Sequence, residues 1–306
     1  MTSTSYHIPV MLRESLGLLI NDTEGIYADG TLGAGGHSAG LLDQLGEGAR
    51  VFGIDHDDEA LKEASVNIND SRFTAVKGNF GYISTLLPPD VHGNLSGVLL
   101  DLGVSSHQID DPARGFSFRE SGPLDMRMSN LRALSAYDVV NSYCYGNLRN
   151  ILFSSGVERK SGQIAKMVIA QRPLETTGDL KDCVEEVVRG PHTVKSLARV
   201  FQAIRIEVNQ ELEMLRTGLE SAAEMLRPGG RLVVISYHSL EDRLVKNFFK
   251  SGNFSGKQEK DFYGNLVRPL EPLFTKPRYA TEEEISTNPR SRSARLRAAE
   301  KTEDAS

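Results

Sequence analysis

The sequence predicts an α/β fold into which a helical region is inserted. Short apolar segments alternate with segments of helical spacing over the first hundred residues, which is the pattern of a βαβ sheet. A further apolar strand, Gly229–Ser236, begins about 130 residues after the fourth predicted strand. Because a crossover between parallel strands needs only a dozen or more residues, a separate segment must interrupt the sheet domain.

The first part of the sheet domain is predicted from apolar runs and from the helical spacing between them. Its strands are predicted at Ile26–Asp29, Val51–Asp55, Phe73–Lys77 and Gly97–Asp101. Its helices are predicted at Val10–Leu19, Ser38–Leu45 and Asp58–Asn67. Asp58 is the expected N-cap of the third helix, and Gly46 is the expected stop of the second.

The inserted segment is predicted to be helical and separate. It opens with turn residues, shows helical apolar spacing around Val139, Leu148 and Ile164, and contains a further short helix over Lys181–Arg189. We therefore expect a sheet domain formed by residues 1–109 and 196–306 and an inserted helical domain formed by residues 110–195.

The last part of the chain completes the sheet domain. A helix is predicted over Asn209–Leu226, because Pro228 and the glycines after it end the helix and turn the chain into the strand Gly229–Ser236. Lys257–Thr287 is polar, contains three prolines and is predicted to form a loop. Ser293–Ala299 is predicted to be a last edge strand.

Composition excludes several classes of protein. Cys144 and Cys183 cannot form a disulfide framework or a zinc site by themselves, and no metal-ligand cluster appears, so we expect no protein-bound metal. The apolar runs are too short to cross a bilayer and the N-terminus lacks a signal peptide, so we expect a soluble, cytoplasmic protein. The net charge of −6 means that any nucleic-acid site must be a local basic patch.

A glycine-rich loop follows the first predicted strand. Gly33, Gly35 and Gly36 come shortly after Asp29, and the second strand ends on Asp55, twenty residues past Gly35. Glycines let a backbone bend sharply and approach a ligand closely. An acid at the end of the second strand can accept hydrogen bonds from both hydroxyls of a ribose, so this layout predicts a site for a nucleoside cofactor.

The loop favours S-adenosylmethionine as that cofactor. A dinucleotide site needs Gly-x-Gly-x-x-Gly, and the spacing of Gly30, Gly33, Gly35 and Gly36 does not match it. Asp29 would repel a pyrophosphate, whereas it would attract the ammonium group of a methionine tail. Asp29 and Gly33 are therefore expected at the methionine end. A dinucleotide site and a purely structural loop are the two alternatives.

Three further residues follow or end predicted elements of the sheet. His37 opens the helix after the glycines, and Phe80 ends the third strand, where a ring can pack on adenine. Asp101 ends the fourth strand, and ligands of open α/β sheets bind beyond the carboxyl ends of the strands. Each also has a simpler interpretation: an idle ring, a core ring and a carboxylate that holds a loop.

Long blocks elsewhere in the chain match the motifs of one family. They are Gly78–Phe80, Leu100–Ser106, Arg114–Phe118, Gly122–Met128, Phe201–Ile206, Ser236–Arg243 and Asn288–Ser293. In these blocks the chain resembles the bacterial 16S ribosomal RNA (cytosine-N4)-methyltransferase family, RsmH or MraW, from His7 to Arg297. The blocks are far more specific than a glycine loop alone.

The resemblance implies a Rossmann-like class I S-adenosylmethionine-dependent methyltransferase, with a doubly wound, mostly parallel sheet and an inserted helical domain that helps to bind RNA. It implies methylation of the exocyclic N4 amine of one cytidine in the decoding centre of 16S ribosomal RNA, cytidine 1402 in the standard numbering. The expected substrate is the small ribosomal subunit. The family's cofactor contacts correspond to Gly35, Gly36, His37, Asp55, Phe80, Asp101 and Gln108.

The proton acceptor for such a reaction stays open at this point. Many amino-methyltransferases carry Asn, Asp or Ser followed by Pro-Pro and an aromatic residue after the fourth strand, but here Asp101 is followed by Leu102-Gly103-Val104. Asp101, Asp125 and His238 are the candidates. The simpler interpretation of His238 is the start of a helix, with Ser239 as its N-cap.

RNA contacts are expected on interleaved basic and aromatic side chains, which bind phosphates and stack on unpaired bases. The first group is Arg114, Phe116, Phe118, Arg119, Arg127 and Arg132. The second is Arg290, Arg292, Arg295 and Arg297 near the C-terminus.

Alternative functions retain a nucleoside-cofactor fold but differ in the substrate or in whether the protein is catalytic. The chain could methylate a protein or a small molecule, or it could be a catalytically silent RNA-binding relative, and a dehydrogenase is a more distant alternative. The intact glycine loop with Asp55 argues against a silent relative, and the Arg/Phe group argues against a small substrate. The sequence leaves open whether the substrate is free RNA or a subunit, and whether the protein is a monomer or a homodimer.

Overall fold

The computed structural model describes residues 9–129 and 133–303 and divides into two compact units. The sheet unit joins the chain up to Gly103 with the chain from Glu213 onward, and the helical unit is Val104–Leu212. The helical unit extends past residue 195, the predicted end of the insert, because α10 (Thr193–Asn209) contributes to its core. No helix in these described ranges is long and apolar enough to cross a membrane.

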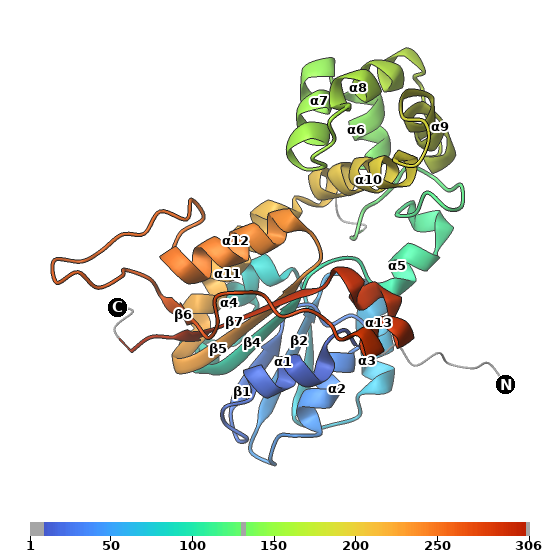
Figure 1. Ribbon diagram of the computed structural model, residues 1–306. Coiled ribbons are helices and arrows are strands. Elements are labelled where there is room, and N and C mark those ends of the chain that lie inside the picture. The colour runs from blue at the N-terminus through green and yellow to red at the C-terminus, as the bar shows by residue number, and fades with distance from the viewer. Residues whose placement is uncertain (1–8, 130–132, 304–306) are drawn as a thin grey trace. The chain divides into compact units, whose positions relative to one another are not determined.

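The described part of the sheet unit contains one sheet of seven strands, in the order β3-β2-β1-β4-β5-β7-β6 (Figure 1). The strands are β1 (Ile26–Asp29), β2 (Arg50–Asp55), β3 (Phe73–Lys77), β4 (Leu95–Asp101), β5 (Leu226–Ser236), β6 (Leu270–Pro272) and β7 (Arg295–Lys301). The first five run parallel, whereas β7 is antiparallel to both of its neighbours. The predicted doubly wound, mostly parallel Rossmann-like sheet is confirmed.

Helices cover both faces of this sheet, which is why residues 98–100 of β4 and 232–235 of β5 are continuous apolar runs. One face carries α1 (Leu12–Leu19), α2 (Gly36–Leu42) and α3 (Asp58–Asn67) (Figure 1). The other carries α4 (Ile83–Leu86), α11 (Glu211–Met225) and α12 (Ser239–Ser251). Shorter elements of this unit are η1 (Phe80–Tyr82), η2 (Pro89–Val91), α13 (Glu282–Thr287) and η4 (Pro289–Ser293).

The apolar stripe of α1 anchors one of these layers. Leu16 and Leu19 are almost completely buried and belong to one cluster with Tyr27, Leu99 and Val233 of the sheet. Burial of such side chains is the main term that stabilises the layer, at about 1.5–3 kcal/mol for each large apolar residue.

Two helix boundaries in the first half differ from the prediction. Asp57, not Asp58, caps α3, because the Asp57 side chain accepts a hydrogen bond from the Glu59 amide at 3.0 Å. Helix α2 ends at Leu42 rather than near Gly46, whose amide donates to the Thr23 carbonyl in a neighbouring loop at 2.7 Å.

The predicted helix over Asn209–Leu226 does not form as one helix: its first residue belongs to α10, and most of the rest forms α11. Asn209 ends α10, and Gln210, in a left-handed conformation with φ +50°, separates it from α11. A left-handed residue breaks a helix, and nothing in the composition of this segment marks it for that conformation.

The C-terminal segment contains more order than the sequence indicated. The predicted loop Lys257–Thr287 includes β6 and α13, and β6 pairs with the outer side of β7. The predicted edge strand near Ser293 is therefore an inner strand, and β6 is the edge. A strand of three residues that contains a proline gives almost no sequence signal, although an edge tolerates it.

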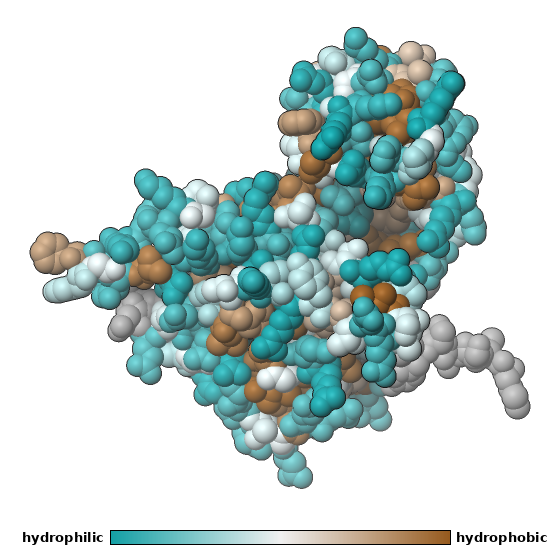
Figure 2. All heavy atoms as spheres, in the orientation of Figure 1, coloured by the Kyte–Doolittle hydropathy of each residue, from teal (hydrophilic) through white to brown (hydrophobic). Residues whose placement is uncertain are grey.

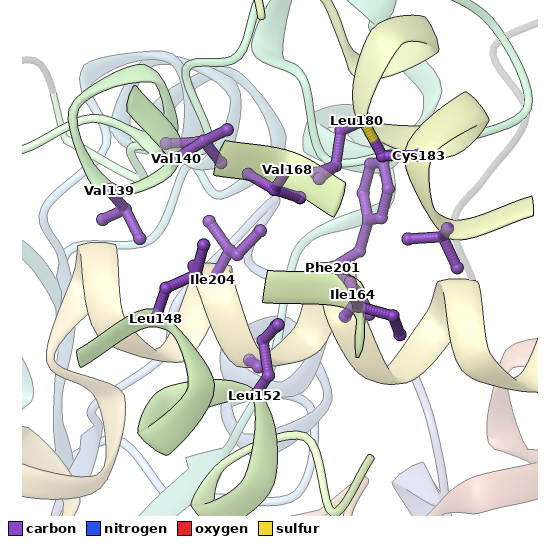
Figure 3. Packing of buried hydrophobic residues seen from close by; sticks show 14 of the residues in the cluster. Val139, Val140, Leu148, Leu152, Ile164, Val168, Leu180, Cys183, Phe201 and Ile204 are labelled. Atoms are coloured by element: carbon purple, nitrogen blue, oxygen red, sulfur yellow. The ribbon is translucent and has the colours of Figure 1, made fainter. Parts of the chain in front are cut away.

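Described helices of the helical unit pack around a core of their own, part of which is seen in Figure 3. Its elements are α5 (Ser106–Asp110), η3 (Pro112–Arg114), α6 (Ala136–Ser142), α7 (Tyr145–Ser154), α8 (Ser161–Ala170), α9 (Thr177–Val187) and α10. Figure 3 shows Leu148, Leu152, Ile164 and Ile204 directed toward one another from α7, α8 and α10. The helical spacing read at Val139, Leu148 and Ile164 is confirmed.

One helix of this unit begins earlier than predicted. α9 starts at Thr177 rather than Lys181, because Thr176 and Asp179 form a reciprocal capping box.

Truncation of a buried side chain in the core of the helical unit should destabilise this unit. Leu152 is 1% exposed, and we expect Leu152→Ala to lower the free energy of unfolding of this unit by about 2–5 kcal/mol, because it removes apolar contacts and leaves a cavity. The matched control is Phe153→Ala, whose side chain is 65% exposed and whose loss should change stability by less than about 0.5 kcal/mol. Denaturant titration measures both; equal losses would contradict this packing.

Candidate active site

Three carboxylates lie along the carboxyl edge of the sheet. Asp29 ends β1, Asp55 ends β2 and Asp101 ends β4. β1 lies between β2 and β4, so the three strand ends are neighbours. The order of the chain reverses between β1 and β4, and ligands of open α/β sheets bind outside the carboxyl ends at such a switch point.

Asp29 holds the glycine-rich loop against the sheet. Its carboxylate is completely buried and accepts hydrogen bonds from the Thr31 amide at 3.1 Å and from the Ser38 hydroxyl at 2.8 Å. The Thr31 hydroxyl in turn accepts a hydrogen bond from the Asp101 amide at 2.6 Å. The predicted residue thus positions the loop; a contact of Asp29 with the methionine end of a cofactor stays a prediction.

The glycine-rich loop depends on backbone conformations that suit glycine. Gly35, the N-cap of α2, has φ +86°, and an added Cβ would lie 2.7 Å from Ile68 Cδ1. Gly33 has φ +51°, and an added Cβ there would meet nothing within 4 Å. The loop is therefore packed on one side and open at Gly33, where a ligand can approach the backbone.

Asp55 is half-buried and fixed by two backbone amides. The Gly33 amide donates to its Oδ2 at 2.9 Å, and the Asp57 amide donates to its Oδ1 at 2.9 Å. A carboxylate oxygen has two acceptor positions, so both oxygens can accept a further hydrogen bond. This oriented acid beside the glycine loop fits the predicted ribose contact.

Asp29 and Asp101 are desolvated without a neighbouring cationic side chain from the part of the chain that the structure describes, and their pKa values are therefore raised. Burial raises the pKa of Asp29 to about 6, and repulsion from Asp55 adds to this. Burial likewise raises the pKa of Asp101 to about 6, with repulsion from Asp29 contributing. Among the described residues, no lysine or arginine pairs with the three acids. A positively charged ligand would relieve this repulsion, whereas a diphosphate would increase it.

His37 does not supply the missing charge. Its ring is buried, with Nε2 3.1 Å from the Val10 carbonyl oxygen and Nδ1 3.9 Å from Asp101 Oδ2. Burial lowers the pKa of His37, so the ring is neutral near pH 7. The histidine therefore holds the N-terminal segment beside α2, and its role as a cofactor contact stays a prediction.

Tyr237 is a member of the site that the sequence analysis did not single out. It follows β5, and its hydroxyl donates a hydrogen bond to Asp101 Oδ1 at 2.8 Å. Burial, followed by the neighbouring Asp101 charge, raises the pKa of Tyr237 well above its ordinary value, so the hydroxyl keeps its proton. Its position just after β5, the strand next to β4, was the available signal.

Tyr237 is itself held in place. The buried Glu241 side chain accepts a hydrogen bond from the Tyr237 amide at 2.9 Å. Gly103 lies against the ring, with an added Cβ only 3.2 Å from Tyr237 Cδ2 and a φ of +122°. The Asp101–Tyr237 pair is thus positioned by Gly103, just after β4, and by Glu241 of α12.

The other two candidates for proton acceptor are engaged elsewhere. His238, not Ser239, is the N-cap of α12: its Nδ1 accepts from the Glu241 amide at 3.3 Å. Asp125 lies in the helical unit and accepts hydrogen bonds from Arg127 Nε at 2.8 Å and Arg127 Nη2 at 2.7 Å. Burial raises the pKa of Asp125, but the hydrogen bonds and charge of Arg127 outweigh burial and hold that pKa below its usual value. Asp125 is therefore a weak base.

Phe80 and Gln108 have local roles in this structure. Phe80 does not end β3 but begins η1, and its half-buried ring packs on Gly218 of α11, where an added Cβ would lie 2.5 Å from Phe80 Cδ2. Gln108 is buried in the helical unit and accepts a hydrogen bond from the Ser105 amide at 3.2 Å. Their contacts with a cofactor stay predictions.

Most of the predicted RNA-binding residues of the helical unit also have structural partners. Phe118 packs edge-to-face on Phe201 with ring centroids 5.3 Å apart, and Phe116 packs against the same core. Arg114 donates to the carbonyl oxygens of Arg127 and Met128. Arg119 is exposed, and Arg132 lies outside the described residues.

The C-terminal arginines divide into two pairs. Arg297 is buried and bonded to Asp242 at 2.7 Å, and Arg295 lies 3.9 Å from the same acid, so both stabilise the sheet unit. Arg292 is exposed and Arg290 is half-buried, both in η4. These two stay predicted RNA contacts.

The comparisons with known proteins decide the family. Residues 4–302 match the model of the MraW methylase family. The chain belongs to this family. Proteins called "Ribosomal RNA small subunit methyltransferase H" are 46% identical in Bacteroides fragilis, 47% in Parabacteroides distasonis and 45% in Flavobacterium johnsoniae. These alignments cover 97%, 97% and 98% of this chain and 98%, 97% and 99% of the relatives.

Membership of a methylase family agrees with the geometry of the site. The protein is a methyltransferase that uses S-adenosylmethionine. The oriented Asp55, the open backbone at Gly33 and the uncompensated charge of Asp29 and Asp101 fit a cationic nucleoside. The alternatives of a dinucleotide site and of a purely structural loop are therefore set aside.

This electrostatic fit predicts a pH dependence of cofactor affinity. In the free protein Asp29 and Asp101 have pKa values of about 6, so both are largely protonated below that pH. A bound cation favours the ionised carboxylates, so binding at low pH must release these protons. We expect the Kd for S-adenosylmethionine to increase as pH falls through about 6, and to be constant above about pH 7. Calorimetry at a series of pH values measures this.

S-adenosylhomocysteine is the matched ligand, because it lacks the sulfonium charge but keeps the ribose and the amino-acid tail. Its Kd should change less over the same range. Identical pH profiles for the two ligands would show that the sulfonium charge is not what the two acids respond to.

Proposed function

We propose that this protein transfers the methyl group of S-adenosylmethionine to the exocyclic N4 amine of one cytidine in the decoding centre of 16S ribosomal RNA, within the small ribosomal subunit. The names of the relatives support a substrate in that RNA. The observation that carries the chemistry is Asp101, a carboxylate with a pKa of about 6 at the switch point of the sheet.

The reaction needs a base as well as a methyl donor. The N4 amine of cytosine is a weak nucleophile because its lone pair is delocalised into the ring, and it must lose a proton as it is methylated. When bound, the cofactor supplies a methyl group on a positively charged sulfur. Asp101 is mostly ionised at pH 7 and is a stronger base than an ordinary aspartate.

Asp101 can receive that proton while Tyr237 keeps it oriented. The bound cofactor would supply its methyl group to N4 and would leave as the neutral thioether, while one N4 proton would pass to the Asp101 carboxylate. Tyr237 donates to Oδ1, which leaves Oδ2 for the amine. The target base must be unstacked from its neighbours to reach such a site.

The proposed roles predict a shift in the pH–rate profile. Asp101 must be ionised to act as a base, so the rate should rise with pH. Because bound S-adenosylmethionine favours the ionised carboxylate, this rise should lie below the pKa of about 6 that Asp101 has in the free protein. The Tyr237 hydrogen bond lowers the pKa of Asp101, so Tyr237→Phe should raise that pKa and move the rising limb to higher pH. Single-turnover rates at saturating S-adenosylmethionine, measured at a series of pH values, give the pH range over which the rate rises. Tyr279→Phe, at an exposed tyrosine, is the control and should leave it unchanged.

Asp101→Asn should lower the rate at saturating cofactor by at least about 100-fold at every pH, because the amide cannot accept the proton. A rate within about threefold of the wild type would remove Asp101 from this role. In that event Asp125→Asn and His238→Gln are the next variants.

The substrate itself is tested by mapping the product. Small subunits from cells that lack this gene should accept labelled methyl from S-adenosylmethionine, with the label on N4 of a single decoding-centre cytidine by mass mapping of nucleosides. Asp55→Ala, which removes the carboxylate at the ribose position, should abolish transfer. Label in a ribosomal protein, or no transfer to subunits or free RNA despite measurable cofactor binding, would contradict the RNA assignment.

A further inference from the structure

A finger-like loop projects from the sheet unit between α12 and β6. This aromatic finger, residues 257–268, contains an antiparallel bridge between Lys260 and Leu266. The Asp261 amide donates to the Asn265 carbonyl at 2.9 Å, and the Asp261 carboxylate accepts from the amides of Tyr263 and Asn265, both at 2.8 Å. The tip is therefore a constructed turn, closed at Gly264 with φ +89°.

Two aromatic rings at the tip have no packing role in the fold. Phe262 is 97% exposed and Tyr263 is 85% exposed, and they contact each other edge-to-face with centroids 5.7 Å apart. Figure 2 shows the hydrophobic tip of this loop standing clear of the sheet unit. The aromatic residue at the base of the loop behaves differently: Phe254 stacks on Phe248 at 5.2 Å. No described residue of the fold buries these rings, so both are available to a partner.

The helix that leads into the finger carries a basic stripe, defined as Arg243, Lys246 and Lys250 of α12. These residues are exposed, lie three and four positions apart on one helical face, and form no ion pair with a described residue. The acids of α12 do not neutralise them, because Glu241 is buried and Asp242 is bonded to Arg297.

Further charges in the finger are mixed. Lys257 and Lys260 are exposed and add two cations, whereas Glu259 is an exposed acid. The Asp261 carboxylate is occupied by the turn. Two lysines and two acids balance in the finger, so on a chain of net charge −6 the local positive charge comes from the stripe, and the finger adds two projecting rings.

We propose that the aromatic finger and the basic stripe are an RNA-binding surface, which is additional to the contacts predicted from the sequence. This proposal rests on the proposed function. Phe262 and Tyr263 stack on unpaired bases of the small-subunit RNA, and the three cations of the stripe bind its phosphates. Exposed rings beside unpaired cations are the combination by which proteins bind single-stranded RNA, where stacking gives affinity without reading sequence.

The rings are tested by the double variant Phe262→Ala/Tyr263→Ala. We expect its KM for small subunits to rise by at least about fivefold, with kcat and the Kd for S-adenosylmethionine unchanged. Tyr279→Ala, which removes a ring that is 61% exposed elsewhere on the sheet unit, should leave KM unchanged. An unchanged KM in the double variant would overturn the role of the rings.

The stripe is tested by the salt dependence of binding. Each phosphate contact contributes about −0.7 to −0.9 to the slope of log affinity against log salt, so Lys246→Ala/Lys250→Ala should make the slope less steep by about 1.5. The matched control is Lys62→Ala, an exposed lysine of α3. Sedimentation of the protein with small subunits measures the affinity without methyl transfer. Equal slopes for the double variant and wild type would overturn the role of the stripe.

The partner is identified by a photoreactive phenylalanine analogue in place of Phe262. Crosslinks to small-subunit RNA support the proposal; crosslinks to a ribosomal protein or to a second copy of this chain overturn it. Because binding and crosslinking need no catalysis, they also separate two failures. Subunits that bind and crosslink through the finger but receive no methyl group would contradict the proposed function alone.

Discussion

The site depends on the placement of three carboxylates at one edge of the sheet without a cationic side chain among the described residues. A parallel sheet brings the ends of β1, β2 and β4 together, and each of these strands ends on an aspartate. The repulsion is sustained because backbone amides and hydroxyls of the surrounding loops bind the carboxylates. The charge of this edge suits a cation, in agreement with the sulfonium cofactor that this family uses.

The same constraint separates the tasks of the three acids. Asp29, completely buried, holds the loop; Asp55, half-buried and bonded to two amides, is oriented for hydroxyl groups. Asp101 accepts a hydrogen bond from Tyr237 at Oδ1, and the proposed proton transfer uses its other oxygen. Identical side chains thus differ in function because burial and hydrogen-bond partners differ, which is the general way in which a fold tunes the pKa of its acids.

The proposed RNA surface and the candidate cofactor site differ in the physical features of the sheet unit on which they rest. The candidate cofactor site is an edge of negative charge held by hydrogen bonds from neighbouring loops, whereas the proposed RNA surface is a set of exposed cations and rings. On an acidic chain, such local segregation is what allows a polyanion to bind. Several arginines expected to bind RNA, such as Arg297, instead stabilise the protein, so exposure distinguishes the two groups.

Sequence alone was sufficient for the features that depend on local pattern. Apolar periodicity predicted the parallel strands and the helical insert, and the glycine loop with Asp55 predicted the cofactor, because turn chemistry and strand ends are written in neighbouring residues. Only the tertiary structure decided which partner each polar group has: Tyr237 for Asp101, Arg127 for Asp125 and Glu241 for His238. It also revealed the short edge strand β6 and the exposure of Phe262. Ionisation, edge pairing and exposure are set by contacts between elements, including segments far apart in the chain, and composition does not record those contacts.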